Sequence, residues 1–127
     1  MADYTVKNLD DVANMAEQYG IEGMEARFPK RDLGLEKVGV SYQTLAPSLR
    51  QSFGHRHAEQ EEVYVVLSGS GRVKVDDEIV ALKERDVIRI AGETMRQFEA
   101  GPHGLTYLAI GAPLTNDTEM VDGWWSD

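Results

Sequence analysis

The chain has 127 residues, of which 42% are hydrophobic and 28% are charged. That is enough for one globular domain with a buried core, and too apolar for a disordered chain. The net charge of −9 argues against nucleic acid and anionic membranes as partners, because both need a clustered positive surface. The lack of cysteine excludes disulfides and thiolate metal sites.

The opening stretch, MADYTVKNLDD, has neither the basic nor the apolar segment of a signal peptide. No apolar run approaches the roughly 20 residues that a membrane-spanning helix needs. We therefore expect a cytoplasmic protein without a membrane partner.

Residues 1–37 are expected to form a helix and an arm that pack on the rest of the domain. Asn8 can cap a helix and Gly20 can end it, which predicts one helix over residues 9–19. Its apolar residues recur at helical spacing: Leu9, Val12, Ala13, Ala16 and Tyr19. Residues 21–37 have mixed charge and are punctuated by glycine and proline. They predict an irregular arm or a short edge element.

Residues 38–111 are predicted to be all-β. Short β-prone runs, among them VGVSYQTL, EEVYVVL, DVIRI and LTYLAI, alternate with turn signals such as SGSG, VDDE and AGPHG. No helical crossover separates these runs, so the strands should be antiparallel. Their even, short spacing indicates a sandwich or a barrel.

The acidic tail, residues 112–127, ends with Trp124 and Trp125. Two tryptophans in a polar segment indicate that it folds back over apolar surface. We expect them to anchor the tail on the barrel or at a dimer seam, and the alternative is an aromatic lid over a ligand pocket. The three segments are expected to form one domain.

A candidate metal site lies in the stretch GHRHAEQEEVYVVLSG. Alternate side chains of a strand share a face, so His55 and His57 point the same way, and Glu62 can return beside them. Two imidazoles and a carboxylate form a ligand set that suits Zn, Mn, Fe, Ni or Co. The structural alternative is a pair of polar strand residues held by local hydrogen bonds.

The spacing of this stretch resembles the first motif of the cupin family. It reads His55, one residue, His57, four residues, Glu62, six residues and Gly69. The resemblance covers residues 38–111. It implies a double-stranded β-helix, or jelly-roll barrel, with the site inside the barrel mouth, and it favours a homodimer.

The second motif of the family matches less well. In RDVIRIAGETMRQFEA, Asp86 is retained, but Arg96 stands where the third histidine ligand is expected. Four other positions of the family pattern are also replaced, by Leu49, Arg85, Ala91 and Ala100. His103 cannot substitute for the missing ligand, because it is expected at the far end of the barrel as a surface turn residue.

Arg96 cannot ligate a metal, since a guanidinium has no free lone pair. At ~4 Å and an effective dielectric constant of ~20, it would repel a divalent cation by roughly 8 kcal/mol. Facing Glu62, it would instead give a charge-balanced pocket without metal. The residues leave open either one divalent metal ion or no cofactor.

The candidate ligand-binding residues are Arg96, Tyr64, Gln43 and Tyr107. Arg96 could clamp an anionic small molecule, and Tyr64 shares the strand parity of Glu62. Three functions follow: a binding or catalytic protein with a metal-free site for a small anion, a metal-dependent dioxygenase or isomerase, and a non-catalytic dimeric module with a vestigial site. The sequence leaves open whether the protein is an enzyme.

Overall fold

The computed structural model describes residues 1–114 and 116–127. In chain order the elements are η1 (Leu9–Asp11), α1 (Met15–Gln18), β1 (Met24–Arg27), α2 (Lys30–Leu33), β2 (Gly39–Leu45), β3 (Phe53–His57), β4 (Glu62–Val75), β5 (Glu78–Lys83), β6 (Val87–Ile90), β7 (Arg96–Gly111) and β8 (Thr118–Asp122). The all-β prediction is therefore confirmed.

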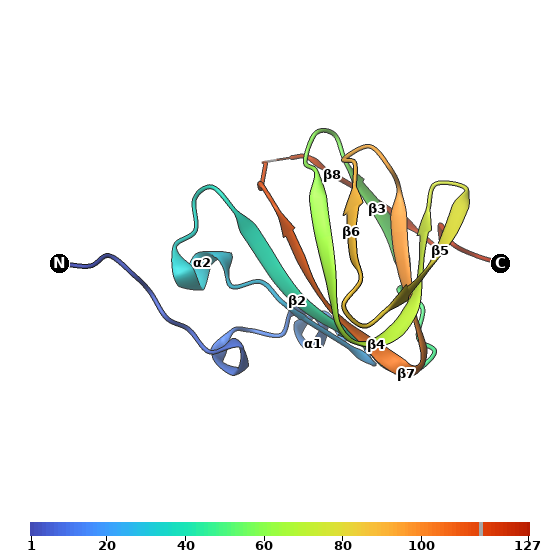
Figure 1. Ribbon diagram of the computed structural model, residues 1–127, viewed down its shortest axis with the longest axis horizontal. Helices are drawn as coiled ribbons and strands as arrows, with labels where there is room; N and C mark the ends of the chain where they lie inside the picture. Colours follow the sequence, from blue (N-terminus) through green and yellow to red (C-terminus); the bar gives the residue numbers. More distant parts are fainter. Residues whose placement is uncertain (115) are drawn as a thin grey trace.

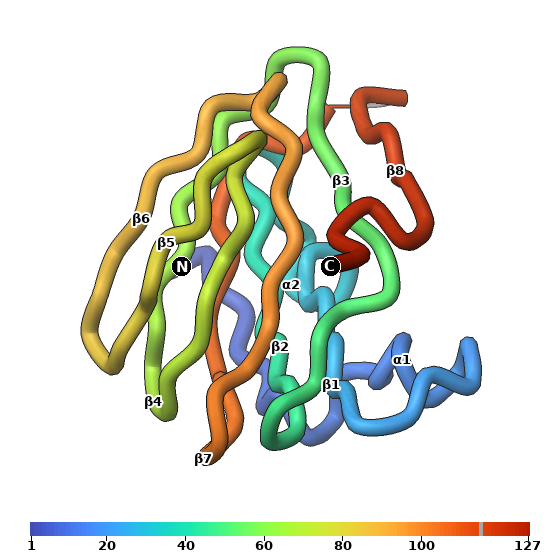
Figure 2. The backbone as a smooth tube through the Cα atoms, turned by 90° about the vertical axis from the view of Figure 1, so that its right-hand side faces the viewer, coloured from blue at the N-terminus to red at the C-terminus, as the bar shows by residue number. Residues whose placement is uncertain are grey.

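The strands form two antiparallel layers that share β4 and β7 (Figures 1 and 2). The first half of β4 and the second half of β7 lie in one layer, in the order β1-β2-β7-β4-β6. The other halves lie in the second layer, in the order β5-β4-β7-β3-β8. Two curled layers joined by long shared strands make the expected jelly-roll barrel.

Glycines allow β4 and β7 to cross at the bend between the layers. Gly69 and Gly104 both have positive φ, 77° and 83°, a conformation that glycine adopts without steric cost. A Cβ atom on Gly69 would lie 2.1 Å from the carbonyl oxygen of Gly104. The sequence motif that ends at Gly69 thus marks a backbone contact as well as a turn.

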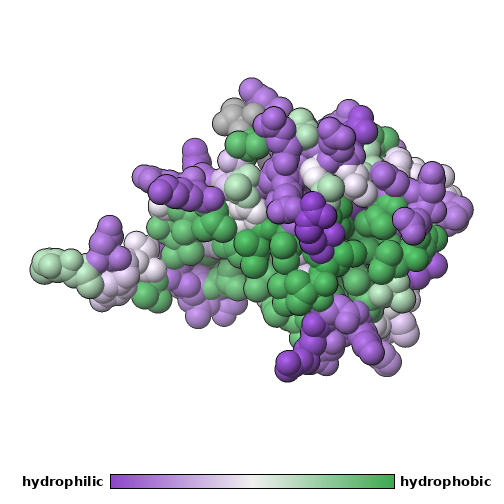
Figure 3. All heavy atoms as spheres, turned by 45° about the horizontal axis from the view of Figure 1, so that its top comes forward, coloured by the Kyte–Doolittle hydropathy of each residue, from purple (hydrophilic) through white to green (hydrophobic). Residues whose placement is uncertain are grey.

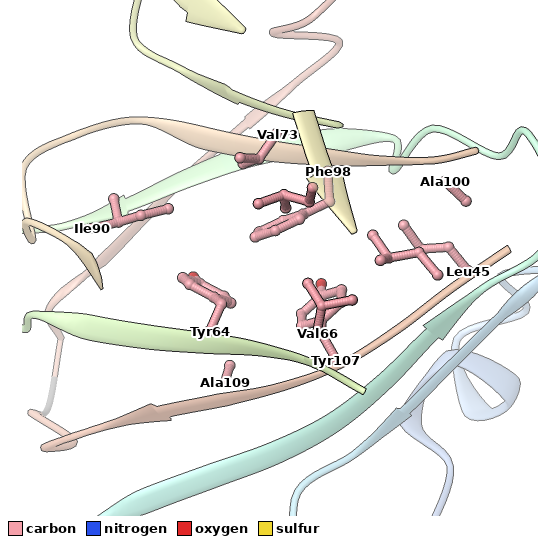
Figure 4. Close-up of a cluster of buried hydrophobic side chains, with 11 residues drawn as sticks. Leu45, Tyr64, Val66, Val73, Ile90, Phe98, Ala100, Tyr107 and Ala109 are labelled. Carbon is pink, nitrogen blue, oxygen red and sulfur yellow. The ribbon is translucent and has the colours of Figure 1, made fainter. Parts of the chain in front are cut away.

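The core fills the space between the layers (Figure 4). Tyr64 and Tyr107 extend from the first layer towards Phe98 and Val73 of the second, and the rings of Phe98 and Tyr107 stack with centroids 4.6 Å apart. All four side chains are at most 2% exposed. The core reaches the candidate site, because Tyr64, Tyr107 and Ala109 belong to the core and also line the cavity described below.

The prediction of one helix over residues 9–19 is wrong. Asn8 caps the short helix η1 and Asn14 caps α1, while the intervening Val12 is extended. The carbonyl oxygen of Val12 accepts from Arg27 of β1, and that of Leu9 accepts both from Arg27 and from the backbone N–H of Val12, which closes the single turn of η1. The arm after Gly20 does include an edge strand, β1, as one of the two expected alternatives. None of the helices in the described residues is long and apolar enough to cross a membrane.

The tail folds back on the outer side of the second layer. Trp125 is 2% exposed, its backbone N–H donates to Gln97 Oε1 at 3.0 Å, and the guanidinium of Arg50 lies 4.1 Å from its ring centroid. Trp124 covers Gly54, where a Cβ atom would come within 2.9 Å of the ring. These contacts match the packing role, and neither tryptophan lines the large cavity described below.

The outer side of the first layer carries two cross-strand rows of mostly apolar residues. One row is Tyr42, Leu108, Val65 and Val87, and the next is Val40, Ile110, Val63 and Arg89. Val87 is 65% exposed, and the other apolar residues are half-buried. Figure 3 shows hydrophobic side chains gathered across the middle of one face of the molecule. An apolar outer sheet face is unusual for a surface that meets only water.

Candidate functional site

Strands β3, β4 and β7 bring the three predicted metal ligands and Arg96 to one place. His55 lies directly opposite Arg96 in the β3–β7 pairing, so both side chains point into the barrel. His57 shares that face, and Arg56 points outwards to pair with Glu119 at 2.9 Å. Glu62 is the first residue of β4, which at this point lies in the facing layer. The shared inward face of the two histidines is confirmed.

The carboxylate oxygen Oε1 of Glu62 is the centre of this cluster. It lies 3.4 Å from His55 Nε2 and 3.2 Å from His57 Nε2. It also accepts hydrogen bonds from Arg96 Nη1 at 3.0 Å and from the Tyr64 hydroxyl. A carboxylate oxygen has about two lone-pair sites, so Arg96 and Tyr64 can fill both, and His55 Nε2 makes a longer hydrogen bond of 3.4 Å to the same oxygen.

The surroundings fix the ionisation of the cluster near neutral pH. Burial raises the pKa of Glu62, but hydrogen bonds from His55 and Tyr64 outweigh it and lower the pKa to about 2. Burial lowers the pKa of His57, and the attraction of Glu62 only partly opposes that effect. Burial and the neighbouring carboxylate raise the pKa of Tyr64. The cluster therefore holds one carboxylate, one guanidinium, a neutral phenol and an imidazole that burial keeps towards its neutral form.

Arg96 is an internal counter-ion in this structure. Its side chain is fully buried, at 0% exposure, and Nη2 donates to the carbonyl oxygens of Ala91 and Gly92 at 2.7 and 3.4 Å. It is not among the residues that line the large cavity. The predicted pairing with Glu62 is present. A direct contact between Arg96 and a ligand stays a prediction, and it would require this side chain to move.

The donor atoms of His55, His57 and Glu62 are spaced for a metal ion. They lie within 4.8 Å of one another. Ligands about 2.1 Å from a metal, at angles of about 90–110°, are roughly 3.0–3.4 Å apart, close to the two distances from Glu62 Oε1. His57 Nε2 is also buried without a hydrogen-bond partner. The three residues fit a metal ion by spacing, whereas Arg96 and Tyr64 compete with it for the same oxygen.

A second set of residues, which the sequence analysis missed, holds the far side of His57. Its Nδ1 lies 3.1 Å from Thr118 Oγ1, 3.2 Å from Gln60 Nε2 and 3.4 Å from Asp117 Oδ2. Asp117 itself accepts the backbone N–H groups of Glu59 and Gln60. A carboxylate behind a histidine orients the ring and sets its tautomer. The only sequence signal was an acid in the tail, whose position depends on β8 pairing with β3.

A cavity of about 610 Å³ opens from the cluster. His55, His57 and Glu62 form its polar end, and Gln43, Tyr64 and Tyr107, predicted as ligand contacts, also line it. Apolar side chains of the N-terminal arm and of β8 complete the wall: Met15, Ile21, Met24, Phe28 and Met120. The arm thus contributes to the cavity, which its sequence did not indicate. His103 is exposed at the β7 bend, as expected, and does not line the cavity.

The comparisons with known proteins agree with this architecture. The family model described as a cupin domain matches residues 41–104. No curated protein matches the chain. A cupin protein from Bacteroides fragilis is 26% identical, with 91% of this chain and 89% of that chain covered and a TM-score of 0.73.

Two enzymes share the fold at lower identity. A sugar phosphate isomerase from the cupin superfamily, from Silicibacter pomeroyi, is 18% identical, with 93% of this chain and 92% of that chain covered and a TM-score of 0.71. A salicylate 1,2-dioxygenase mutant from Pseudoaminobacter salicylatoxidans is 14% identical, with 77% of this chain but only 30% of that chain covered and a TM-score of 0.64. The matched domain, the jelly-roll barrel and the position of the cluster inside it show that the chain belongs to the cupin family.

Proposed function

We propose that this protein binds a small, largely apolar molecule in the cavity, with the His55–His57–Glu62 cluster at its polar end. The observation that carries the proposal is the cavity itself, whose volume of about 610 Å³ lies in the range of small-molecule sites. Gln43, Tyr64 and Tyr107 are the proposed polar contacts. A vestigial site would be expected to be filled by neighbouring side chains, and this space is open.

The charges on the cavity wall support a neutral ligand over the anion expected from the sequence. Among the described residues that line the cavity, Glu62 is the acid and none is lysine or arginine. An anion would be placed near a carboxylate whose own counter-ion, Arg96, is already engaged. Burying a second negative charge there without a cation would be costly.

The test is binding of a neutral probe to the isotope-labelled protein, followed by NMR. Isopropylbenzene, added up to its sub-millimolar solubility in water, should shift the amide signals of Gln43, Tyr107 and Ala109 along the cavity wall. Ala26 lines the cavity and is 8% exposed, so Ala26→Trp should block binding. Ala81→Trp, on the exposed side of β5, should leave binding intact. If neither this probe nor other small aromatic molecules shift these signals, the proposal is wrong.

A metal-dependent enzyme is the second candidate, favoured by the ligand spacing and by the orphaned His57 Nε2. His55, His57 and Glu62 would hold a divalent ion, which would supply Lewis-acid chemistry in the cavity. Asp117 would keep the His57 ring oriented. At least one of the hydrogen bonds from Tyr64 and Arg96 to Glu62 Oε1 would have to break or lengthen.

Elemental analysis of the purified protein and of Arg96→His separates the two candidates. The metal-free site predicts an empty native protein and a variant that takes up metal, because the variant exchanges a cation for a third imidazole. A native protein that contains close to one metal ion per chain would instead favour the metal-dependent candidate.

A further inference from the structure

One wall of the cavity carries a hydrogen-bonded row of polar side chains: Ser41, Gln43, Tyr107 and Gln51. All four line the cavity, and they stand in an otherwise mostly apolar wall. Ser41, Gln51 and Tyr107 are at most 6% exposed. Polar groups buried to this degree have defined partners, so the direction of each hydrogen bond in the row can be worked out.

A backbone N–H fixes the direction at one end of the row. The N–H of Phe98 can only donate, and it lies 2.9 Å from Gln51 Oε1. The other side of that amide is therefore the NH2 group, which donates to the Tyr107 oxygen at 3.1 Å. The orientation of Gln51 thus follows from the main chain.

The remaining directions follow in turn. The Tyr107 oxygen accepts from Gln51, so its single proton is free to donate to Gln43 Oε1 at 3.0 Å. The reverse orientation of Gln43 would leave the buried Tyr107 proton without an acceptor, which costs free energy. With Oε1 so placed, Gln43 Nε2 donates to Ser41 Oγ at 3.1 Å.

This order leaves protons without partners on the cavity wall. Each amide nitrogen has two protons and each hydroxyl has one. Within the described part of the chain, Gln43 Nε2 and Gln51 Nε2 each use one proton in a side-chain hydrogen bond, and Ser41 Oγ accepts one. The second amide proton of Gln43, the second amide proton of Gln51 and the Ser41 proton remain. These unpaired protons are what a ligand has to satisfy on this wall, because each oxygen of the row already accepts one hydrogen bond and lacks only a second. Glu62 at the polar end accepts.

We propose that the ligand of this cavity is a small neutral carbonyl compound, such as a ketone, ester or amide, whose oxygen accepts from the Ser41–Gln43–Gln51 wall. This inference rests on the proposed binding function and adds the chemical class of the ligand. The rest of the molecule lies against the apolar wall. A carboxylate matches the donors but not the charge of the wall, because no lining residue among those described is lysine or arginine.

Three probes of similar shape test the inference by NMR titration. Acetophenone has the carbonyl, isopropylbenzene replaces it with an apolar group, and benzoate adds a negative charge. One hydrogen bond predicts that acetophenone binds roughly two- to twelvefold more tightly than isopropylbenzene. Benzoate should bind more weakly than acetophenone.

Substitutions locate the preference on the wall. Gln43→Met keeps the length of the side chain and removes its donor, so the preference for acetophenone should shrink towards one. Gln18→Met, on the exposed end of α1 outside the cavity wall, is the matched control and should keep the full preference. Ser41→Ala provides a second, smaller change should Gln43→Met fail to fold.

The outcomes separate the two proposals. If all three probes fail to bind, the binding function itself is wrong. Equal binding of acetophenone and isopropylbenzene would overturn only the assignment of the acceptor. Tighter binding of benzoate would overturn the neutral class, and an unchanged preference in both wall variants would show that the donors lie elsewhere.

Discussion

Replacing Arg96 with methionine tests whether the guanidinium is a structural counter-ion. The side chain is 0% exposed, and its Nη1 lies 3.0 Å from the carboxylate of Glu62, which is 14% exposed. At an effective dielectric constant of ~20 this attraction is roughly 5 kcal/mol. Tyr64 still donates to Glu62 in the variant, and the carbonyl oxygens of Ala91 and Gly92 keep other backbone donors. We therefore expect a loss at the lower end of the usual range for a broken buried pair, about 3 kcal/mol.

Chemical denaturation followed by circular dichroism measures this loss. The matched control is Arg89→Met. Arg89 pairs with Glu61, but its side chain is 64% exposed and that of Glu61 is 57% exposed, so the control should cost less than about 1 kcal/mol. In a double-mutant cycle with Glu62→Gln, the two substitutions at the cluster should couple by more than about 1 kcal/mol. If Arg96→Met is no more costly than Arg89→Met, or if the cycle is additive, Arg96 is not the counter-ion of Glu62.

Three further predictions concern the tail, the acid limit and the outer sheet face. Trp125→Ala should lower the free energy of unfolding by at least about 2 kcal/mol, and Trp124→Ala by clearly less. Both variants should bind isopropylbenzene as the native protein does, because the tail packs outside the cavity. Loss of probe binding would instead support a lid. Burial raises the pKa of Glu99, but hydrogen bonds from Arg72 and Arg50 outweigh burial and lower the pKa, so ionised Glu99 stabilises the fold at pH values above its unfolded-state pKa and loses this effect as the pH falls. Glu99→Gln should therefore flatten the decline of the melting temperature below about pH 4.5, and an unchanged decline would refute this. The homodimer expected from the sequence would bury the apolar rows of the first layer, so light scattering should show that Val65→Lys is a monomer. The control Ile79→Lys, on exposed β5, should stay dimeric. A monomeric native protein would contradict the expectation.

The antiparallel β architecture and the inward-facing histidines could be predicted because they depend on local patterns, whereas the jelly-roll barrel was implied by the resemblance to the cupin motif. Alternation within β3 places His55 and His57 on one face whatever their partners are. The motif from His57 through Glu62 to Gly69 consists of one turn and one strand segment, and residues close together in the sequence determine both of these elements. The pairing of Arg96 with Glu62 was one of the alternatives left open by the sequence, since each needs a partner when buried.

The rest depended on contacts between distant segments. Residues 9–19 have apolar side chains at helical spacing, which predicted a helix there. In the structure, however, the guanidinium of Arg27 in β1 donates to the carbonyl oxygens of Leu9 and Val12, and the backbone N–H of Ala26 donates to Asn14 Oδ1. Similarly, the sequence of β8, TEMVD, has no regular alternation of apolar and polar residues to reveal the strand. Asp117 reaches His57 only through that strand. Long-range pairing of this kind overrides local propensity.

An arginine at position 96 changes the chemistry of the cluster, but its side chain does not line the cavity. With histidine at this position, three imidazoles that ligate a metal in their neutral form and one carboxylate would leave one negative charge for the cation to balance. With arginine, the charge of Glu62 is already balanced, and Oε1 has its two donors. A metal must then overcome both the repulsion of the guanidinium and the loss of a hydrogen bond, whereas a neutral carbonyl compound needs neither change. The apolar wall and the donors of Ser41, Gln43 and Gln51 line the cavity, whereas Arg96 does not. Binding of a neutral ligand is therefore compatible with an arginine at the position where the family motif leads one to expect a third histidine.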